Sequence, residues 1–208
     1  ISPHFLVDGK QEEEMRKRRG VAERREIAIR VADGVARALA CTKPASGKLP
    51  FAHTVQRMKL APWKVSRKES DWAAAEYKKV TKNGDTTSWY PQRLRAAVDL
   101  FEGRKKSHPV PVELHFLRIG DAVVATNPFE LFVDYAQRIK ARSSAAQTLI
   151  VQLCCGHNMY LPTARAVPGG GFSASPVICE VGPEGGAQLV NATLKAIKKL
   201  FPPAQRLR

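Results

Sequence analysis

The stretch that decides the fold is GDAVVATNPFELF, residues 120–132. Its apolar run at 122–126 is typical of a buried strand. Asn127 followed by Pro128 is typical of a helix start, with an N-cap and then proline at the first helical position. The stretch therefore predicts a buried strand that leads directly into a helix, and Glu130 is expected in the first turn of that helix.

A second block, GHNMYLPT at residues 156–163, follows about thirty residues later. The apolar segment before it, residues 148–154, predicts a fully buried strand, and the block itself predicts a loop that presents Tyr160. Glu130 and Tyr160 are thus an acid and a phenol, each delivered by the end of a buried strand. Together they suit half of a metal or hydrolytic site.

The segments around these blocks predict an α/β arrangement. Residues 110–117 alternate as a strand and return through residues 122–126, which predicts a hairpin with its tip at 119–121. A short strand at 177–181 and a closing helix at 183–201 are also expected. The glycine run at 169–171, in the loop expected at 156–175, predicts either a lid over a site or a flexible connection.

The first half of the chain is helix-rich. Residues 11–42 predict one long helix, divided at Gly20 into a charged part and a packed part, with a linker at 43–47. Residues 51–60 suit a strand. Ser66 and Glu69 have the spacing of a capping box that opens one helix, and a second helix is expected to end near residue 101. We expect this helical pair to be an insertion that lies over the sheet. The aromatic residues in this region either line an apolar groove or pack in the core: Trp63, Trp72, Trp89 and Tyr90.

Composition places the 208-residue chain among globular proteins, with 44% hydrophobic and 25% charged residues. The chain begins at Ile1 without a methionine, which indicates a processed product or a fragment, so targeting signals cannot be read and an extracytoplasmic location stays open. The net charge of +15 comes mainly from the first half. Such a basic surface suits anionic polymer or peripheral membrane contact. The chain has no zinc-finger, RNA-binding or Walker motif, which argues against nucleic acid as a partner.

The four cysteines have no paired C-x-x-C spacing. Cys154 and Cys155 are adjacent and would point to opposite faces of a strand, which makes them poor joint ligands for one metal ion. We expect burial as small apolar residues for all four: Cys41, Cys154, Cys155 and Cys179.

Two segments are expected. Residues 1–108 form a basic, helix-rich segment with one strand and the helical insertion, and residues 109–208 form an α/β segment with the Glu130 and Tyr160 blocks. Together they predict one α/β domain, a mixed sheet with flanking helices, whose N-terminal part is missing.

The order of these blocks resembles the neutral/alkaline non-lysosomal ceramidase family, in particular the back part of its catalytic domain in bacterial relatives. The motifs that carry the resemblance are LRIGD at 117–121, NPFELF at 127–132, GHNMYLPT at 156–163, the Gly-Gly-Phe at 170–172 and the closing helix. The resemblance covers roughly residues 109–201 and implies that the chain is part of a larger ceramidase-like domain.

In that family, two histidines from the front of the domain and one Glu and one Tyr from the back hold a zinc ion. The resemblance places the Glu on Glu130 and the Tyr on Tyr160. His157 has no counterpart in the family, but it is close to Tyr160 in sequence and is a candidate catalytic residue. The resemblance implies a partial zinc site in an amidohydrolase that cleaves the amide of an N-acyl sphingoid or related lipid. The other ligands would come from the missing N-terminal part or from a second chain.

The chain departs from the family at Phe129, which replaces the usual glycine and is expected to crowd the site beside Glu130. The loop at 171–173 lacks the family's Tyr-Glu. Four histidines match neither of the two histidine motifs that the family has in the front of its domain: His4, His53, His108 and His115. Two alternatives therefore stay open, a metal-free relative that acts as a binding or structural module and a basic surface-binding protein.

Overall fold

The computed structural model describes residues 9–43 and 47–202, and these form two compact units that meet in sequence between Lys48 and Leu49. The first unit holds α1 (Lys10–Arg19) and α2 (Glu23–Ala40). The predicted single helix is therefore broken, because Gly20 adopts a left-handed conformation at φ 62° and caps α1. Residues 44–46 of the predicted linker and His4 lie outside the described residues.

Within the first unit, Glu26 connects the two helices. Its carboxylate is bound by Arg30 at 2.9 Å and by Arg19 of α1 at 3.1 Å. The apolar stripe of α2, expected to be packed, is exposed at Val31, Val35 and Leu39.

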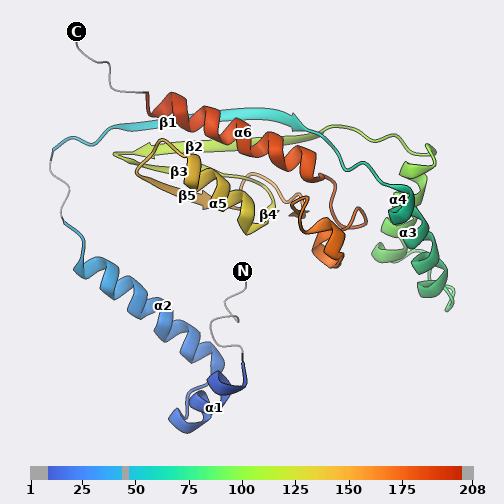
Figure 1. The fold of residues 1–208 in the computed structure, drawn as a ribbon, viewed down its shortest axis with the longest axis horizontal. Coiled ribbons are helices and arrows are strands. Elements are labelled where there is room, and N and C mark those ends of the chain that lie inside the picture. Colours follow the sequence, from blue (N-terminus) through green and yellow to red (C-terminus); the bar gives the residue numbers. More distant parts are fainter. Residues whose placement is uncertain (1–8, 44–46, 203–208) are drawn as a thin grey trace. The chain divides into compact units, whose positions relative to one another are not determined.

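The second unit is built on a four-stranded mixed sheet in the order β1-β2-β3-β5 (Figure 1). Strands β1 (Phe51–Leu60) and β2 (Val110–Ile119) pair antiparallel over their full length, and β3 (Ala122–Thr126) returns antiparallel from β2. Strand β5 (Gln147–Val151) pairs with β3 in parallel. This confirms the α/β fold class, the mixed sheet and the hairpin predicted from residues 110–126.

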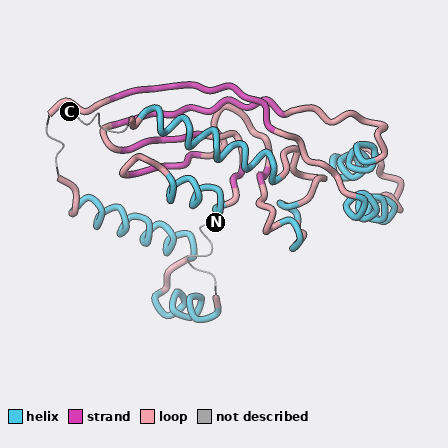
Figure 2. Tube along the Cα trace, turned by 45° about the horizontal axis from the view of Figure 1, so that its top comes forward, coloured by secondary structure: helices cyan, strands magenta, loops and turns pink. Residues whose placement is uncertain are grey.

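Two helices lie on one face of this sheet, as Figures 1 and 2 show. They are α5 (Val133–Arg142) and α6 (Pro183–Leu200), which contact each other and the strands. Alternate residues of β2, namely Val112, Leu114 and Phe116, point into the core between the helices and the sheet. The other residues of the same strand, such as Glu113 and His115, lie on the opposite face and are only half-buried.

The predicted helical insertion is a pair of helices, α3 (Arg67–Val80) and α4 (Trp89–Phe101), which contact each other. The expected capping box opens α3: the Ser66 hydroxyl accepts from the Glu69 amide, and the Glu69 carboxylate accepts from the Ser66 amide. Trp63, Leu94 and Ile178 belong to a second, smaller core beside this pair. None of the described helices is long and apolar enough to cross a membrane.

The loop from residue 152 to residue 182 differs from the prediction. Residues 177–181 form no strand; only Val181 makes an isolated bridge, to Pro62. Two short 3₁₀ helices occupy Val167–Gly169 and Phe172–Ala174. Strand β5 ends at Val151 and is not fully buried, because Leu149 is 43% exposed on the open face of the sheet.

Candidate functional site

Glu130 and Tyr160 lie side by side on two short parallel strands. Strand β4 (Glu130–Leu131) pairs with β6 (Tyr160–Leu161), and Glu130 is the direct register partner of Tyr160. The Glu130 amide donates to the Met159 carbonyl at 2.9 Å, and the Phe132 amide donates to Leu161 at 3.3 Å. Register partners on neighbouring strands point to the same side, so the pairing brings the two predicted residues together.

The prediction that Glu130 lies in the first turn of a helix is wrong, since the helix α5 begins three residues later, at Val133. The Asn127 side chain accepts from the Phe129 amide at 3.1 Å, which closes a local turn. The backbone amide of Asn127 continues the sheet by donating to the Val151 carbonyl at 2.9 Å. Asn-Pro therefore forms a turn between two strands here, an alternative use of the residues that also favour helix starts.

Phe129 does not crowd the site as expected. Its ring is fully buried in the main core, together with Leu161 and Tyr135. Consecutive residues of an extended chain point to opposite sides, so burial of Phe129 leaves Glu130 on the accessible side. The substitution for the family glycine thus adds core volume.

Hydrogen bonding to the neighbouring Glu130 carboxylate and partial burial raise the pKa of Tyr160 above its ordinary value. His157 approaches the same carboxylate, with 3.9 Å between its Nε2 and Oε1 of Glu130, and its side chain is 61% exposed. All three predicted site residues therefore meet at the small, separate two-stranded sheet of β4 and β6. The other described histidines lie elsewhere, His53 on β1, His115 on β2 and His108 before β2.

An aromatic wall extends from Tyr160 towards α4. The Phe172 ring meets Tyr160 edge-on, with 6.2 Å between centroids, and meets Trp89 at 6.4 Å. Beyond Phe172 lies a cavity of about 540 Å³ between α3 and the 167–178 loop. Its lining is mostly apolar and includes Trp72, Tyr90, Val167, Phe172 and Ile178. The aromatic residues of the insertion therefore have two roles. Trp63 packs in the second core, whereas Trp72 and Tyr90 line this cavity.

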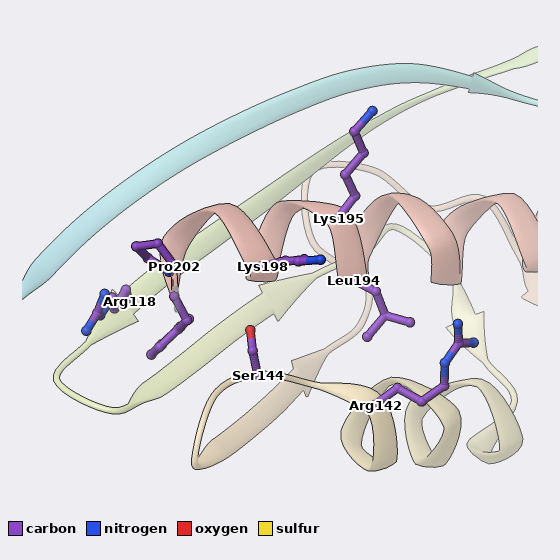
Figure 3. A pocket seen from close by; sticks show the side chains of 8 residues that line it. Arg118, Arg142, Ser144, Leu194, Lys195, Lys198 and Pro202 are labelled. Atoms are coloured by element: carbon purple, nitrogen blue, oxygen red, sulfur yellow. The ribbon is translucent and has the colours of Figure 1, made fainter. Parts of the chain in front are cut away.

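A second cavity, of about 610 Å³, is lined by four cationic side chains, Arg118, Arg142, Lys195 and Lys198 (Figure 3). Arg142 ends α5, and the two lysines are near the end of α6. Cations at these places stabilise the helix C-termini, which explains part of the cluster without a ligand. Arg118 is further fixed by donating to the Gly120 carbonyl at 2.9 Å.

One group of potential metal ligands was not expected from the sequence. Glu113, His115 and Cys155 place one ligand atom each within 4.8 Å of one another. Glu113 and His115 are two residues apart on a strand and therefore share a face, a signal present in the sequence. The expectation that all four cysteines are buried is wrong, because Cys41 and Cys155 are exposed and only Cys179 is fully buried.

No protein-family model and no curated protein sequence matches the chain. Among solved structures, the neutral ceramidase of Pseudomonas aeruginosa is similar over 86% of this chain, with a TM-score of 0.53 and 16% identity. A ceramidase complexed with C2 is similar over 47% of this chain, with a TM-score of 0.40 and 17% identity.

The chain spans about a third of the Pseudomonas protein, namely 33% of its length. At this identity the similarity establishes the fold: residues of this chain adopt the fold of part of a neutral ceramidase. The relationship to that family, inferred from the Glu130 and Tyr160 blocks, is confirmed at the level of the fold.

Proposed function

We propose that the chain forms the back part of a ceramidase-like, zinc-dependent amidohydrolase, in which Glu130 and Tyr160 supply two of the zinc ligands. The observation that carries the proposal is the direct pairing of these two residues on β4 and β6. The shared fold with part of a neutral ceramidase supports it independently of side-chain geometry.

The donor set suits a cation. A carboxylate and a phenol on register partners present two oxygens on one side, and the neighbouring carboxylate raises the pKa at which the phenol loses its proton. A divalent cation would replace that proton and bind both oxygens. Zinc bound there would lower the pKa of a bound water, which provides a nucleophile for an amide carbon.

In this proposal, His157 would hold or move a proton beside this pair. Its exposed ring lies 3.9 Å from the Glu130 carboxylate, so it can accept a proton at Nε2 and keep it close to the carboxylate. The chain offers no further described histidine here, so the remaining zinc ligands would come from another part of the same protein or from a second chain.

The apolar cavity beyond Phe172 supports a lipid-like amide substrate. Its aromatic and aliphatic lining suits an acyl or alkyl chain, and Phe172 links the cavity to the Tyr160 ring. The amide of such a substrate would then lie near the Glu130–Tyr160 pair.

The test is zinc content of the full natural protein, measured by atomic emission, and hydrolysis of a short-chain N-acyl sphingosine. Glu130→Gln and Tyr160→Phe are each expected to contain less zinc than the wild type and to lose activity together. The control is Asp134→Asn, a change of an acidic side chain close in sequence that does not lie on β4. If both site variants keep full zinc content, Glu130 and Tyr160 are not ligands, and the metal-free scaffold becomes the better explanation.

A further inference from the structure

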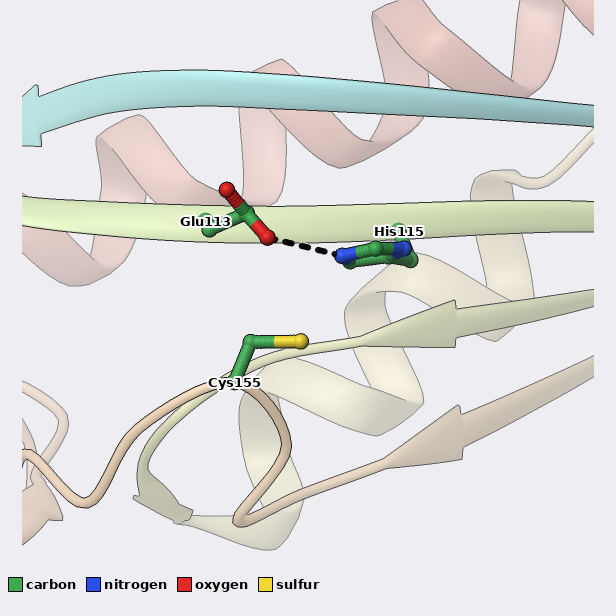
Figure 4. A group of neighbouring side chains, drawn as sticks. All are labelled: Glu113, His115 and Cys155. Carbon is green, nitrogen blue, oxygen red and sulfur yellow. Dashed lines mark hydrogen bonds and ion pairs between the residues drawn. The ribbon is translucent and has the colours of Figure 1, made fainter.

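The open face of the sheet carries a polar cluster separate in its residues from the Glu130–Tyr160 pair. Figure 4 shows Glu113 and His115 on β2 and the thiol of Cys155 in the segment that follows β5. The ligand atoms of these three side chains lie within 4.8 Å of one another. Thiolate, imidazole and carboxylate are the three protein ligand types that zinc binds.

His115 has the second hydrogen bond that metal-bound histidines need. Its Nε2 faces Glu113 Oε1 at 3.0 Å, while its Nδ1 lies 3.0 Å from Nε2 of His53. The two imidazoles are stacked, with 5.1 Å between centroids, which fixes the orientation of the His115 ring. If Nε2 binds a metal ion, Nδ1–H can donate to His53, so the ring stays satisfied in both states.

Glu113 is held as a carboxylate with one oxygen directed into the cluster. Arg57, its register partner on β1, binds the other oxygen, with 2.6 Å from Nε to Oε2. Oε1 is the oxygen that faces His115, so it is the one available as a ligand.

Cys155 is held in a conformation that its residue type rarely adopts. Its φ is 58°, and Leu153 two residues earlier has a φ of 59°. Left-handed backbone is unfavourable at a residue with a side chain and is found where surrounding structure or function maintains it. Here it aims an exposed thiol at the imidazole and carboxylate of β2. A neighbouring cavity of about 390 Å³, lined by Glu113 and Cys155, leaves room for water.

We propose that Glu113, His115 and Cys155 form a binding site for a zinc-class divalent cation, with water as the fourth ligand. On binding, the Cys155 thiol releases its proton to solvent, a metal–sulfur bond forms, and His115 Nε2 and Glu113 Oε1 complete the protein ligands. The ion would link β2 to the segment that leads to Tyr160, five residues after Cys155. It would thereby stabilise the conformation of that segment.

Cobalt(II) provides the test, because only a thiolate ligand gives its intense near-ultraviolet charge-transfer absorption. The full natural protein, stripped of metal with a chelator, is titrated with Co²⁺. We expect this absorption in the wild type, in Cys154→Ser and in the double variant Glu130→Gln/Tyr160→Phe. It should disappear in Cys155→Ser. His53→Ala should retain it but bind Co²⁺ about 10- to 100-fold more weakly, as loss of an outer hydrogen-bond partner does.

The mutants separate this site from the proposed zinc site. Absorption that survives Glu130→Gln/Tyr160→Phe cannot come from that pair, whatever happens to amide hydrolysis in the same variants. Absence of the absorption in the wild type, or its persistence in Cys155→Ser, would overturn the proposal. Circular dichroism of Cys155→Ser provides the folding check, which this exposed position should pass.

Discussion

Replacement of Gly186 by alanine tests how α6 positions the site. A β-carbon on Gly186 would overlap the hydroxyl and Cζ of Tyr135 and would lie 2.9 Å from its Cε1. Tyr135 cannot move away easily, because it is 1% exposed and its hydroxyl donates to the Pro162 carbonyl at 2.9 Å. Pro162 follows Tyr160 by two residues, so the clash acts on the segment that carries the candidate ligand.

The magnitude follows from three opposing contributions. Glycine to alanine inside a helix gains about 1 kcal/mol. Overpacking of a filled core costs about 1–3 kcal/mol, and displacement of a buried hydroxyl from its acceptor costs roughly 1–3 kcal/mol. The net expected loss is about 3 kcal/mol in the free energy of unfolding. For a unit of this size each kcal/mol lowers the Tm by about 2–4 °C, so we expect a decrease of roughly 6–12 °C.

The assay is thermal unfolding followed by circular dichroism. Asn191→Ala, at an exposed position of the same helix, is the control and should change the free energy of unfolding by less than about 0.5 kcal/mol. In a Tyr135→Leu background the clash is smaller, so the added cost of Gly186→Ala should fall by about 2 kcal/mol. A Tm of Gly186→Ala at or above that of the wild type would refute the reasoning.

Three further predictions concern local interactions. Ser66→Ala removes the capping box of α3 and should cost about 1 kcal/mol in chemical denaturation; an unchanged midpoint would show that the cap is dispensable. Burial raises the pKa of Tyr135 to about 12 from an ordinary value of 10.0, so the stability it contributes is complete below pH 10 and is lost as the pH rises towards 12. Tyr135→Phe should flatten that decline in urea unfolding, and an identical pH profile would contradict the assignment. Glu130→Gln should lower the pKa of Tyr160, measured as phenolate absorbance against a Tyr160→Phe reference, because the carboxylate that disfavours the phenolate is gone.

Regular periodicity allowed much of the fold to be predicted. Alternation in β2, the turn at residues 119–121 and the apolar stripe of the closing helix specify their elements locally, and all three are present. The capping box was equally local, since Ser66 and Glu69 satisfy each other within one turn. The misassigned helix start at Asn127 shows the limit of local patterns, because the residue suits both a helix cap and a turn. The hydrogen bond from its backbone amide to the Val151 carbonyl, distant in sequence, decided between them.

The sequence by itself also determined the identities of Glu130, Tyr160 and His157 as candidates, because the motifs carry residue types at strand ends. Only the tertiary structure decided that Glu130 faces Tyr160 in register, since β4 and β6 are too short to be recognised by periodicity. The tertiary structure also brings Glu113, His115 and Cys155 together. Cys155 lies forty residues from His115 in the chain and reaches it through the parallel pairing of β3 with β5. Local patterns fix elements and ligand types, whereas contacts between distant segments depend on the packing of the whole sheet.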